Sequence, residues 1–404
     1  MIIAYLQKRN KREHLRHFYR ELKMIVRPLL IGVVSILLAA GCIHQTEPTT
    51  NVKHPNSIDF LKVAVHKLDP QLDEKKPIAR ANYGGWTQKA SYLIGELNDS
   101  WVTLYDLESK SFLWWLKNRN GLSTQAFFDQ DAAYLPFYDG TLVKVDIVSG
   151  KVIWQVSLDS FIASSIVKKD NRIFAVTTNQ TLYALDQTTG MTFWAFDAGV
   201  PSIMNLRNQA APIAVFDHLY FSTQAKFYCL NIEDGTLVWK QDVAIPNLVN
   251  SKFNDPVGQI GFTGTSLILA YANGNVISYS LEENTKHNFL WKHEGDFSSI
   301  NTSFYSEGIF YIGTHEGWLY ALDSTSGDVF WKKKFHFSVD MIFINGDKII
   351  VNSNSGMISV LSVLDGKDLF YERLSGTVVT PPFAYKNSLY FSTGMGNLYQ
   401  FQIR

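Results

Sequence analysis

Apolar and polar residues alternate in short, paired runs along most of this chain. Within residues 317–331, GWLYALDSTSGDVFW, Leu319–Asp323 follows the period of two that a half-buried strand requires. Asp323 and Gly327 bound a turn, because Asp caps backbone N–H groups and Gly accepts a positive φ. Val329–Trp331 is then the returning strand. The pattern predicts a small β-hairpin, which needs neighbouring strands to bury its apolar face.

The same hairpin recurs along the chain at a nearly regular spacing. Close copies occupy residues 140–154, 180–194 and 225–239, and weaker or truncated copies occupy residues 102–114, 274–291, 356–371 and 396–404. Six of the hairpins end on a tryptophan, at steps of 40, 40, 45, 52 and 40 residues: Trp114, Trp154, Trp194, Trp239, Trp291 and Trp331. A period of about 40–50 residues is typical of a β-propeller blade. We expect these aromatic side chains to pack one blade against the next.

These repeats predict an all-β fold, an eight-bladed β-propeller with four antiparallel strands in each blade. The last repeat offers only three strands, near Val378–Ala384, Ser388–Ser392 and Asn397–Ile403. Closing the ring removes exposed sheet edges, so a strand from the other end of the chain should complete this blade. Asp59–Leu68, DFLKVAVHKL, alternates in the required way and is predicted to be that strand.

The N-terminus has the features of a processing signal. An apolar run, Leu29–Leu38, follows Arg27 and is too short to span a bilayer by itself. The residues after it, Ala39-Ala40-Gly41-Cys42, resemble the lipobox of bacterial lipoproteins, although Ala39 stands where that family more often has Leu. The resemblance implies that Cys42 becomes the lipidated first residue of the mature protein. An ordinary signal peptide that contains a cysteine is the alternative.

The chain therefore divides into three predicted parts. Residues 1–41 are the lipoprotein signal sequence, 42–57 a flexible polar tether, and 58–404 the propeller. The basic stretch before Met24 is long for a leader, so we expect translation to start at Met24. The alternative is that residues 1–23 are a real, extended cytosolic part of the signal sequence.

Charge and cysteine usage narrow the functional classes. Of 37 basic and 37 acidic residues, eight basic and two acidic ones lie in residues 1–41, which leaves 29 basic and 35 acidic residues and a formal charge of −6. No basic stripe remains for a phosphate backbone, so we expect no nucleic-acid partner. Cys229 is the second of two cysteines and lies on a predicted strand, where sister repeats carry alanine. With Cys42 lipidated, we expect no disulfide within the chain, and Cys229 to fill buried space.

The hairpins resemble the quinoprotein (pyrroloquinoline quinone, PQQ) propeller repeat, whose consensus is near LYALDxxTGxxxW; residues 180–194 and 317–331 match it closely. The dehydrogenases of that family have two adjacent cysteines beside the quinone and a calcium ion held by carboxylates and an Asn. This chain has no Cys-Cys pair, and its acids, such as Asp186, fall mainly in turns. Beyond the predicted signal sequence and tether, His287 and His293 are the closest histidine pair and are interpreted as solvated loop residues. We expect no catalytic residue, no metal site and no cofactor, PQQ included.

Two segments carry a more specific resemblance. Residues 200–212, VPSIMNLRNQAAP, and 269–275, LAYANGN, resemble segments of the BamB family, lipoprotein subunits of the machinery that inserts β-barrels into the bacterial outer membrane. The family's acidic residues before the second segment have their nearest counterpart in Asn254-Asp255-Pro256. The sequence that follows Pro256, VGQIGFTG, departs from the family, so the match at Asp255 is the weaker one.

The resemblance implies that two loops bind periplasmic domains of the central barrel subunit. Met204 and Leu206 would then be apolar anchors, Arg207 would pair with a carboxylate or carbonyl, and Asp255 would add a charge at the rim. Core packing is the alternative for Met204 and Leu206, and a solvated loop charge is the alternative for Arg207.

We therefore expect a non-enzymatic, lipid-anchored scaffold of the outer-membrane β-barrel assembly machinery on the periplasmic face. Ile43, after the lipobox Cys, favours the outer membrane over the inner one by the same resemblance. A propeller that binds carbohydrate or another envelope protein is the alternative function, and a quinoprotein dehydrogenase is the least favoured.

Overall fold

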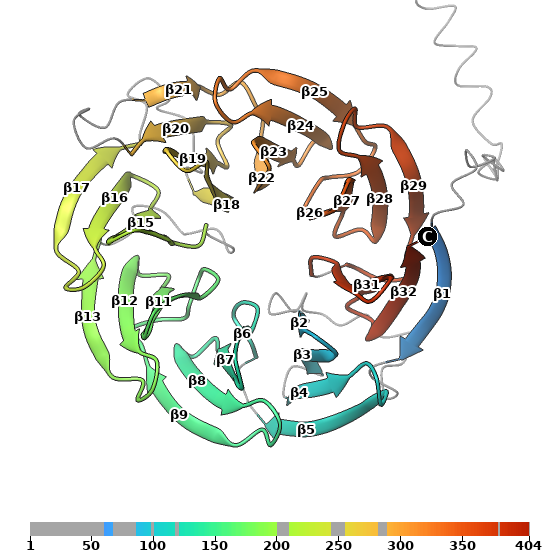
Figure 1. The fold of residues 1–404 in the computed structure, drawn as a ribbon, viewed down its shortest axis with the longest axis horizontal. Coiled ribbons are helices and arrows are strands. Elements are labelled where there is room, and N and C mark those ends of the chain that lie inside the picture. The colour runs from blue at the N-terminus through green and yellow to red at the C-terminus, as the bar shows by residue number, and fades with distance from the viewer. Residues whose placement is uncertain are drawn as a thin grey trace, which may run out of the picture. The chain divides into compact units, whose positions relative to one another are not determined.

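The computed structural model describes residues 60–67, 86–97, 101–117, 121–199, 210–243, 255–281, 289–378 and 380–403. The chain divides into two units, Met1–His54 and Pro55–Arg404, and all the described residues belong to the second. In these residues the secondary structure is β throughout, and the strands form eight four-stranded sheets. Figure 1 shows the sheets arranged as the blades of a ring. The predicted eight-bladed propeller is confirmed.

Each blade has an innermost strand beside the ring's centre, and a second strand pairs with it. The innermost strands of blades 1 to 8 are β2 (Thr87–Lys89), β6 (Phe127–Asp129), β10 (Val167–Lys169), β14 (Ile213–Val215), β18 (Pro256–Phe262), β22 (Ile300–Ser306), β26 (Met341–Asn345) and β30 (Phe383–Tyr385). The second strands are β3 (Tyr92–Leu97), β7 (Ala132–Pro136), β11 (Arg172–Val176), β15 (His218–Ser222), β19 (Ser266–Tyr271), β23 (Ile309–Thr314), β27 (Lys348–Asn352) and β31 (Ser388–Ser392).

The third and outermost strands form the hairpins that the repeats predict. The third strands are β4 (Trp101–Asp106), β8 (Thr141–Asp146), β12 (Thr181–Asp186), β16 (Lys226–Asn231), β20 (Val276–Ser280), β24 (Trp318–Asp323), β28 (Met357–Ser362) and β32 (Asn397–Ile403). The outermost strands are β5 (Ser111–Lys117), β9 (Val152–Ser157), β13 (Thr192–Asp197), β17 (Leu237–Asp242), β21 (Phe289–His293), β25 (Val329–Lys334), β29 (Asp368–Arg373) and, in blade 8, β1 (Phe60–Lys67).

The turn of the hairpin uses the two residues that the sequence singles out. The Asp323 carboxylate accepts hydrogen bonds from the backbone N–H groups of Thr325, at 2.7 Å, and Ser326, at 3.0 Å. The donors from Ser326 and Thr325 hold the pKa of Asp323 below its usual value, because they favour the charged form. Gly327 has a φ of +80°, which a side chain would strain.

The ring closes as the sequence predicts. β1 pairs antiparallel with β32, with Val65 opposite Tyr399, so a strand from the N-terminal side completes the last blade. The predicted range Asp59–Leu68 differs from β1 by one residue at each end. In the same blade, the expected strand near Val378–Ala384 is instead an isolated bridge from Val378 to Thr393, followed by β30.

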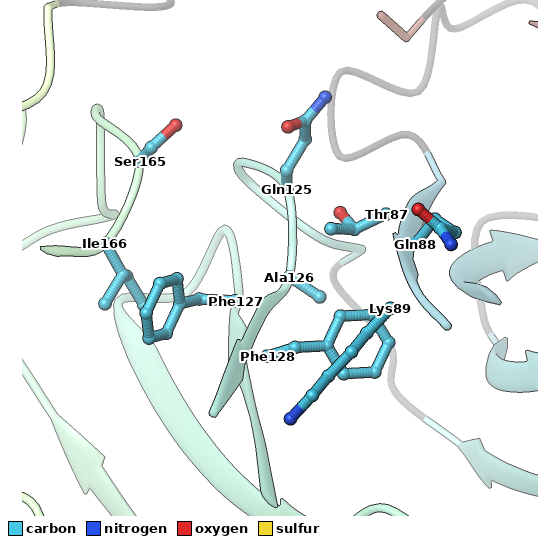
Figure 2. A pocket seen from close by; sticks show the side chains of 9 residues that line it. All are labelled: Thr87, Gln88, Lys89, Gln125, Ala126, Phe127, Phe128, Ser165 and Ile166. Carbon is cyan, nitrogen blue, oxygen red and sulfur yellow. The ribbon is translucent and has the colours of Figure 1, made fainter. Parts of the chain in front are cut away.

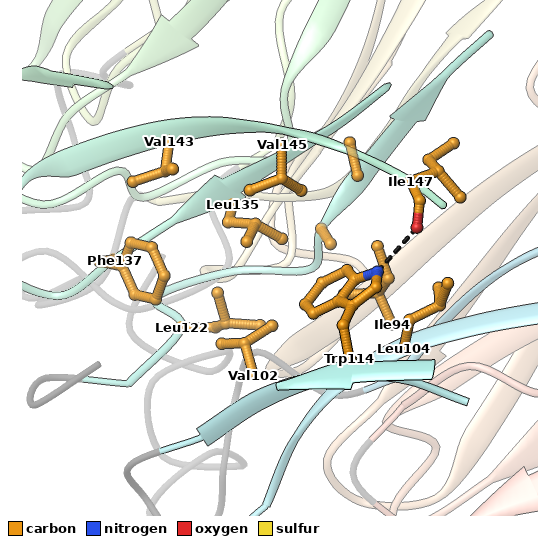
Figure 3. Packing of buried hydrophobic residues seen from close by; sticks show 12 residues of the cluster. Ile94, Val102, Leu104, Trp114, Leu122, Leu135, Phe137, Val143, Val145 and Ile147 are labelled. Carbon is orange, nitrogen blue, oxygen red and sulfur yellow. Dashed lines mark hydrogen bonds between the residues drawn. The ribbon is translucent and has the colours of Figure 1, made fainter. Parts of the chain in front are cut away.

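The hydrophobic core is divided among the blade junctions. Each of eight clusters of buried residues lies between two neighbouring blades. Figure 3 shows the cluster between blades 1 and 2, where the Trp114 indole packs among aliphatic side chains such as Leu104 and Val145. Stability thus comes from contacts between neighbours around the ring.

The repeat tryptophans join the blades, as the sequence predicts. The indole N–H of Trp114 donates to the backbone oxygen of Ile147 in the next blade, at 2.7 Å (Figure 3). The ring also lies against the turn glycine of that blade, because a Cβ at Gly150 would come within 2.6 Å of it. The same indole–glycine contact recurs at four other junctions, in the pairs Trp154–Gly190, Trp194–Gly235, Trp291–Gly327 and Trp331–Gly366.

A β-bulge precedes the aromatic position in blades 1 to 7, and the alternation pattern does not predict it. In blade 3, Ala184 pairs with Trp194 but Leu185 pairs with Thr192, so Phe193 has no partner in the ladder. A bulge residue projects away from the regular face of the sheet, and Phe193 is accordingly 49% exposed. The corresponding register shifts occur in the other six blades.

Candidate functional site

The segment with the predicted anchors joins blade 3 to blade 4. Met204, Leu206 and Arg207 lie outside the described residues, as does Cys42. The two ends of the segment are described: Gly199 follows β13, and Ala210 precedes β14. Ala210 is buried and belongs to the cluster between blades 4 and 5. The segment is therefore fixed at its C-terminal end by a packed junction.

The structure brings the ends of the two predicted loops together. The Ala210 backbone N–H donates to the backbone oxygen of Pro256, at 3.1 Å. Pro256 begins β18 of blade 5 and directly follows Asp255, the acid of the second predicted loop. The ends of two segments about 45 residues apart in sequence thus meet at the same junction, because each inter-blade connection leads from an outermost strand into the innermost strand of the next blade.

Asp255 is not the exposed rim charge that the sequence predicts. Its side chain is buried, with 1% of its surface exposed. The Gln224 side-chain N–H donates to its Oδ1 at 3.0 Å, and its backbone oxygen accepts from the Ala272 N–H at 2.9 Å. Gln224 lies in the turn between β15 and β16 of blade 4, so this hydrogen bond connects two blades. A buried carboxylate needs such donors. Through this contact, Asp255 holds blade 5 against blade 4.

The second motif, residues 269–275, also has a structural role. The Tyr271 hydroxyl lies 3.0 Å from Ser222 Oγ in the neighbouring blade. Burial raises the pKa of Tyr271, so the hydroxyl stays neutral at physiological pH. Asn275 Oδ1 accepts from the Gly295 N–H at 2.8 Å, and Gly274 takes a φ of +94° where a Cβ would collide with the Phe297 oxygen. Tyr271 therefore helps to join blades 4 and 5, while Gly274 and Asn275 contact the connection that leads from blade 5 to blade 6.

A cavity of about 430 Å³ lies beside the innermost strands of blades 1 to 3. Figure 2 shows its lining, Thr87, Gln88, Lys89, Gln125, Ala126, Phe127, Phe128, Ser165 and Ile166. The Lys89 ammonium group donates to the backbone oxygen of Gln130. The cavity offers neutral amides, hydroxyls and two phenyl rings, and no carboxylate or thiol is part of its lining.

Comparison with known proteins identifies the family. The family model described as outer membrane protein assembly factor BamB matches residues 98–333 and 315–404. The BamB of Yersinia pestis is 23% identical over 398 residues, which cover 93% of this chain and 98% of that protein. The BamB of Legionella pneumophila (strain Paris) is 25% identical over 217 residues, which cover 51% of this chain and 54% of that protein.

The chain belongs to the BamB family.

The fold of a solved BamB agrees. The crystal structure of BamB from Moraxella catarrhalis superposes with a TM-score of 0.71 at 17% identity, over 85% of this chain and 100% of that one. BamB relatives are named as assembly factors rather than as enzymes. The PQQ-like repeats thus belong to a propeller of the BamB family, whose model is described as an outer membrane protein assembly factor.

Histidine and cysteine side chains among the described residues make structural contacts. Among the described residues, no three His, Cys, Asp or Glu side chains gather where they could hold a metal ion. His293 contacts Asp296, at 2.9 Å, and the backbone oxygen of Gly327 in the next blade, at 2.9 Å. Burial raises the pKa of Cys229 to about 12, so its thiol stays protonated at neutral pH.

Sequence reasoning located the junction between blades 4 and 5 but missed the residues that build it. Gln224 and Ser222 carry contacts across the junction, yet no motif marks them. A polar residue beside an apolar strand reads as a turn or surface residue, and only tertiary contacts show that these two are buried. The acid in Asn254-Asp255-Pro256 was found through family resemblance, which said nothing about its burial.

Proposed function

We propose that this protein is a non-enzymatic, lipid-anchored scaffold of the outer-membrane β-barrel assembly machinery. Membership of the BamB family carries the proposal, because the family model extends over both halves of the propeller. In the mature protein, Cys42 bears the lipid, residues 42–57 are the tether, and the ring faces the periplasm. The partner is the central barrel subunit, bound through its periplasmic domains.

The proposed contact is made by the loop between blades 3 and 4. Met204 and Leu206 supply apolar anchors, and Arg207 pairs with a carboxylate or carbonyl of the partner. Asp255 acts indirectly: its buried carboxylate binds Gln224 and holds blade 5 beside the end of this loop. The hydrogen bond between Ala210 and Pro256 supports this arrangement, since it restrains the loop where it joins the ring. A restrained loop loses less conformational entropy on binding.

The test is recovery of the barrel subunit from envelope extracts with the full-length lipidated protein. Arg207→Ala should lower the recovery at least about tenfold, the usual loss for a central interface arginine. Arg373→Ala is the matched control, because Arg373 is an exposed arginine on β29 of blade 7. Equal recovery with Arg207→Ala would refute the site. No barrel subunit recovered by any variant would refute the proposed partner.

A propeller for carbohydrate or another envelope protein predicts a different phenotype. Deleting the gene should lower the amount of folded β-barrel proteins in the outer membrane if the protein is an assembly scaffold. Unchanged barrel levels would contradict that role and favour the other binding function.

A further inference from the structure

The junction between blades 8 and 1, where the ring closes, lacks the indole–glycine contact that joins other blades. By the register of β1 and β32, Ala64 occupies the place of the repeat tryptophan, since it pairs with Gln400 as Trp194 pairs with Ala184. Lys110 takes the place of the turn glycine, with a φ of +53°. The indole–glycine contact found at five of the junctions, including that between blades 1 and 2, is therefore absent from this one.

Blade 1 carries an aromatic cluster at this junction instead. Trp115 directly follows the repeat residue Trp114, where blades 2 to 7 have Gln155, Ala195, Lys240, Lys292, Lys332 and Tyr371. It stacks on Phe112, with ring centroids 4.7 Å apart, and meets Trp101 edge-to-face at 6.4 Å. Phe112 packs against the buried cluster between blades 8 and 1. The exposed aromatic side chains are thus continuous, through Phe112, with the buried cluster between blades 8 and 1.

These side chains remain open to solvent. Trp101, Leu113 and Trp115 are 36%, 43% and 49% exposed, and we name them, together with Lys117, the seam patch. The Lys117 ammonium group lies 5.7 Å from the centroid of the Trp101 ring. Trp114 is 8% exposed, so the tandem tryptophans have different roles: the first packs between blades 1 and 2, and the second faces outward.

We propose that the seam patch is a membrane-contact surface, through which the propeller rests on an anionic bilayer beside its lipid anchor. The inference rests on the proposed lipidation of Cys42. Trp is enriched at the membrane–water interface because its ring is apolar and its N–H is polar. Lys117 adds a cation that attracts anionic headgroups while its alkyl chain lies along the apolar surface.

The length of chain between the proposed lipid anchor and β1 favours a membrane as the occupant. Residues 43–59 join Cys42 to β1, and β1 and β5 follow each other around the rim of the ring (Figure 1). A flexible chain of this length spans roughly 20–25 Å on average, and at most roughly 60 Å. β1 itself adds roughly 26 Å. The seam patch therefore lies within the distance that the anchor permits.

Local rather than net charge supports the contact. The chain from residue 42 onward carries a formal charge of −6, which opposes binding to an anionic surface. Lys110 and Lys117 are both exposed on blade 1. By contrast, the exposed ends of the outermost strands of blades 3, 4 and 5 carry Asp197, Asp242 and Glu294. An anionic bilayer would thus meet less repulsion at β5 than at the ends of blades 3, 4 and 5, although Glu108 is exposed beside Lys110 and pairs with Lys386. Blade 6 also presents cations, Lys332, Lys333 and Lys334, on its outermost strand.

The test uses tryptophan fluorescence and vesicles of phosphatidylethanolamine and phosphatidylglycerol with brominated acyl chains, which quench only tryptophans close to the bilayer. The full mature chain is compared as wild type, as Trp101→Phe/Trp115→Phe, and as Trp318→Phe. Trp318 is the matched control: it lies on blade 6 with Lys332 and Lys334 over its ring, at 5.3 and 4.9 Å. Near-ultraviolet circular dichroism checks that every variant is folded.

The expected result is quenching of the wild type and of Trp318→Phe, and its loss in the double variant, which removes two of the ten tryptophans. Equal quenching of the double variant, or no quenching of an anchored wild type, would overturn the proposal. Acrylamide, a soluble quencher added without vesicles, tests whether protein already covers the seam patch. If it fails to quench Trp101 and Trp115, the chain itself or a second copy covers the patch, and the proposal is wrong.

A Cys42→Ser variant separates the patch from the anchor. Added to the same vesicles at high lipid concentration, it should show weaker binding with the same dependence on Trp101 and Trp115. If wild type and Cys42→Ser float with vesicles equally well, the result contradicts lipidation of Cys42 but leaves the seam patch unaffected. Failure of Cys42→Ser to be quenched at any lipid concentration would count against the seam patch, whatever the state of Cys42.

Discussion

At the residue scale, a turn glycine of one blade packs against the indole ring of the neighbouring blade. Gly235 has a φ of +71°, and a Cβ there would come within 2.5 Å of the Trp194 ring. The Trp194 N–H donates to the backbone oxygen of Ile232 at 3.2 Å, so the same ring is held by a hydrogen bond and by close packing. The glycine is therefore required by its backbone conformation and by the space that the indole occupies.

Gly235→Ala tests this second requirement. The substitution should destabilise the fold by roughly 1–3 kcal/mol beyond the cost of an alanine at positive φ, because the methyl group overpacks the junction. Gly295→Ala is the control, since Gly295 has the same φ of +71° and a Cβ there meets nothing within 4 Å. The measurement is the free energy of unfolding in urea. Equal losses for both variants would show that the indole yields to the methyl group.

Buried hydroxyls make stability sensitive to alkaline pH. Burial raises the pKa of Tyr311 to about 12, and burial also raises the pKa of Tyr220 and Tyr279. Above about pH 9 the unfolded chain loses tyrosine protons that the folded chain retains, so the unfolded state gains stability and the free energy of unfolding falls.

Tyr311→Phe should therefore flatten the alkaline part of the stability curve. Between pH 10 and pH 12 the variant should lose roughly 1–3 kcal/mol less than the wild type, because one shifted titration is gone. Tyr371→Phe is the control, because it removes a tyrosine that is 41% exposed instead of a buried one. Urea unfolding across this pH range gives both results. Parallel curves for wild type and Tyr311→Phe would contradict the prediction.

At the element scale, the outermost strand decides whether a blade is complete. In blade 8 this strand is β1, and its partner strand β32 carries Leu398 and Phe401, which are 0% and 1% exposed. β1 comes from the other end of the sequence, so the last sheet is held together by pairing between segments more than 300 residues apart. Without it, β32 would be an exposed edge with unpaired backbone groups.

A variant without residues 60–67 should be less stable and should aggregate, because β32 becomes a free edge. A synthetic peptide of residues 59–68 should restore thermal stability when added in excess, since it can pair with the open edge. A scrambled peptide of the same composition is the control. Stability that does not change on deletion, or rescue by both peptides, would contradict the role of β1 as the closing strand.

At the scale of the whole molecule, stability is distributed around the ring. Eight junction clusters link eight blades, and each cluster contains residues from only two neighbouring blades. Such a molecule resembles a repeat array whose ends have been joined. Closure turns both terminal blades into interior ones, so loss of closure should weaken the blades on either side first.

Hydrogen exchange should report this order. In the variant without β1, backbone amides of β30–β32 and β2–β5 should lose protection before those of blades 3 to 5, because fraying starts at the opened junction. The wild type should not show this difference between the two groups of blades. Mass spectrometry of peptic fragments resolves them. Uniform loss of protection in the variant would indicate that the ring unfolds as one unit even when it is open.

The sequence by itself determined the repeat and hence the ring. Regular spacing of Trp114, Trp154 and Trp194, alternation within each hairpin, and a last repeat one strand short are local properties of the chain. They were enough to predict eight blades, packing by the tryptophans and closure by β1, because blades of one length joined by short connections have few other ways to bury their faces.

Only the tertiary structure decided how individual polar and aromatic residues are used. Asp255 and Trp115 show this most clearly: the acid is buried against Gln224, and the tryptophan is exposed although it adjoins a buried one. Burial depends on what the neighbouring blade presents at the same place, and that neighbour lies about 30 residues or more away in sequence. Local patterns define the faces of a strand, while the partner across each junction decides which of those faces meets water.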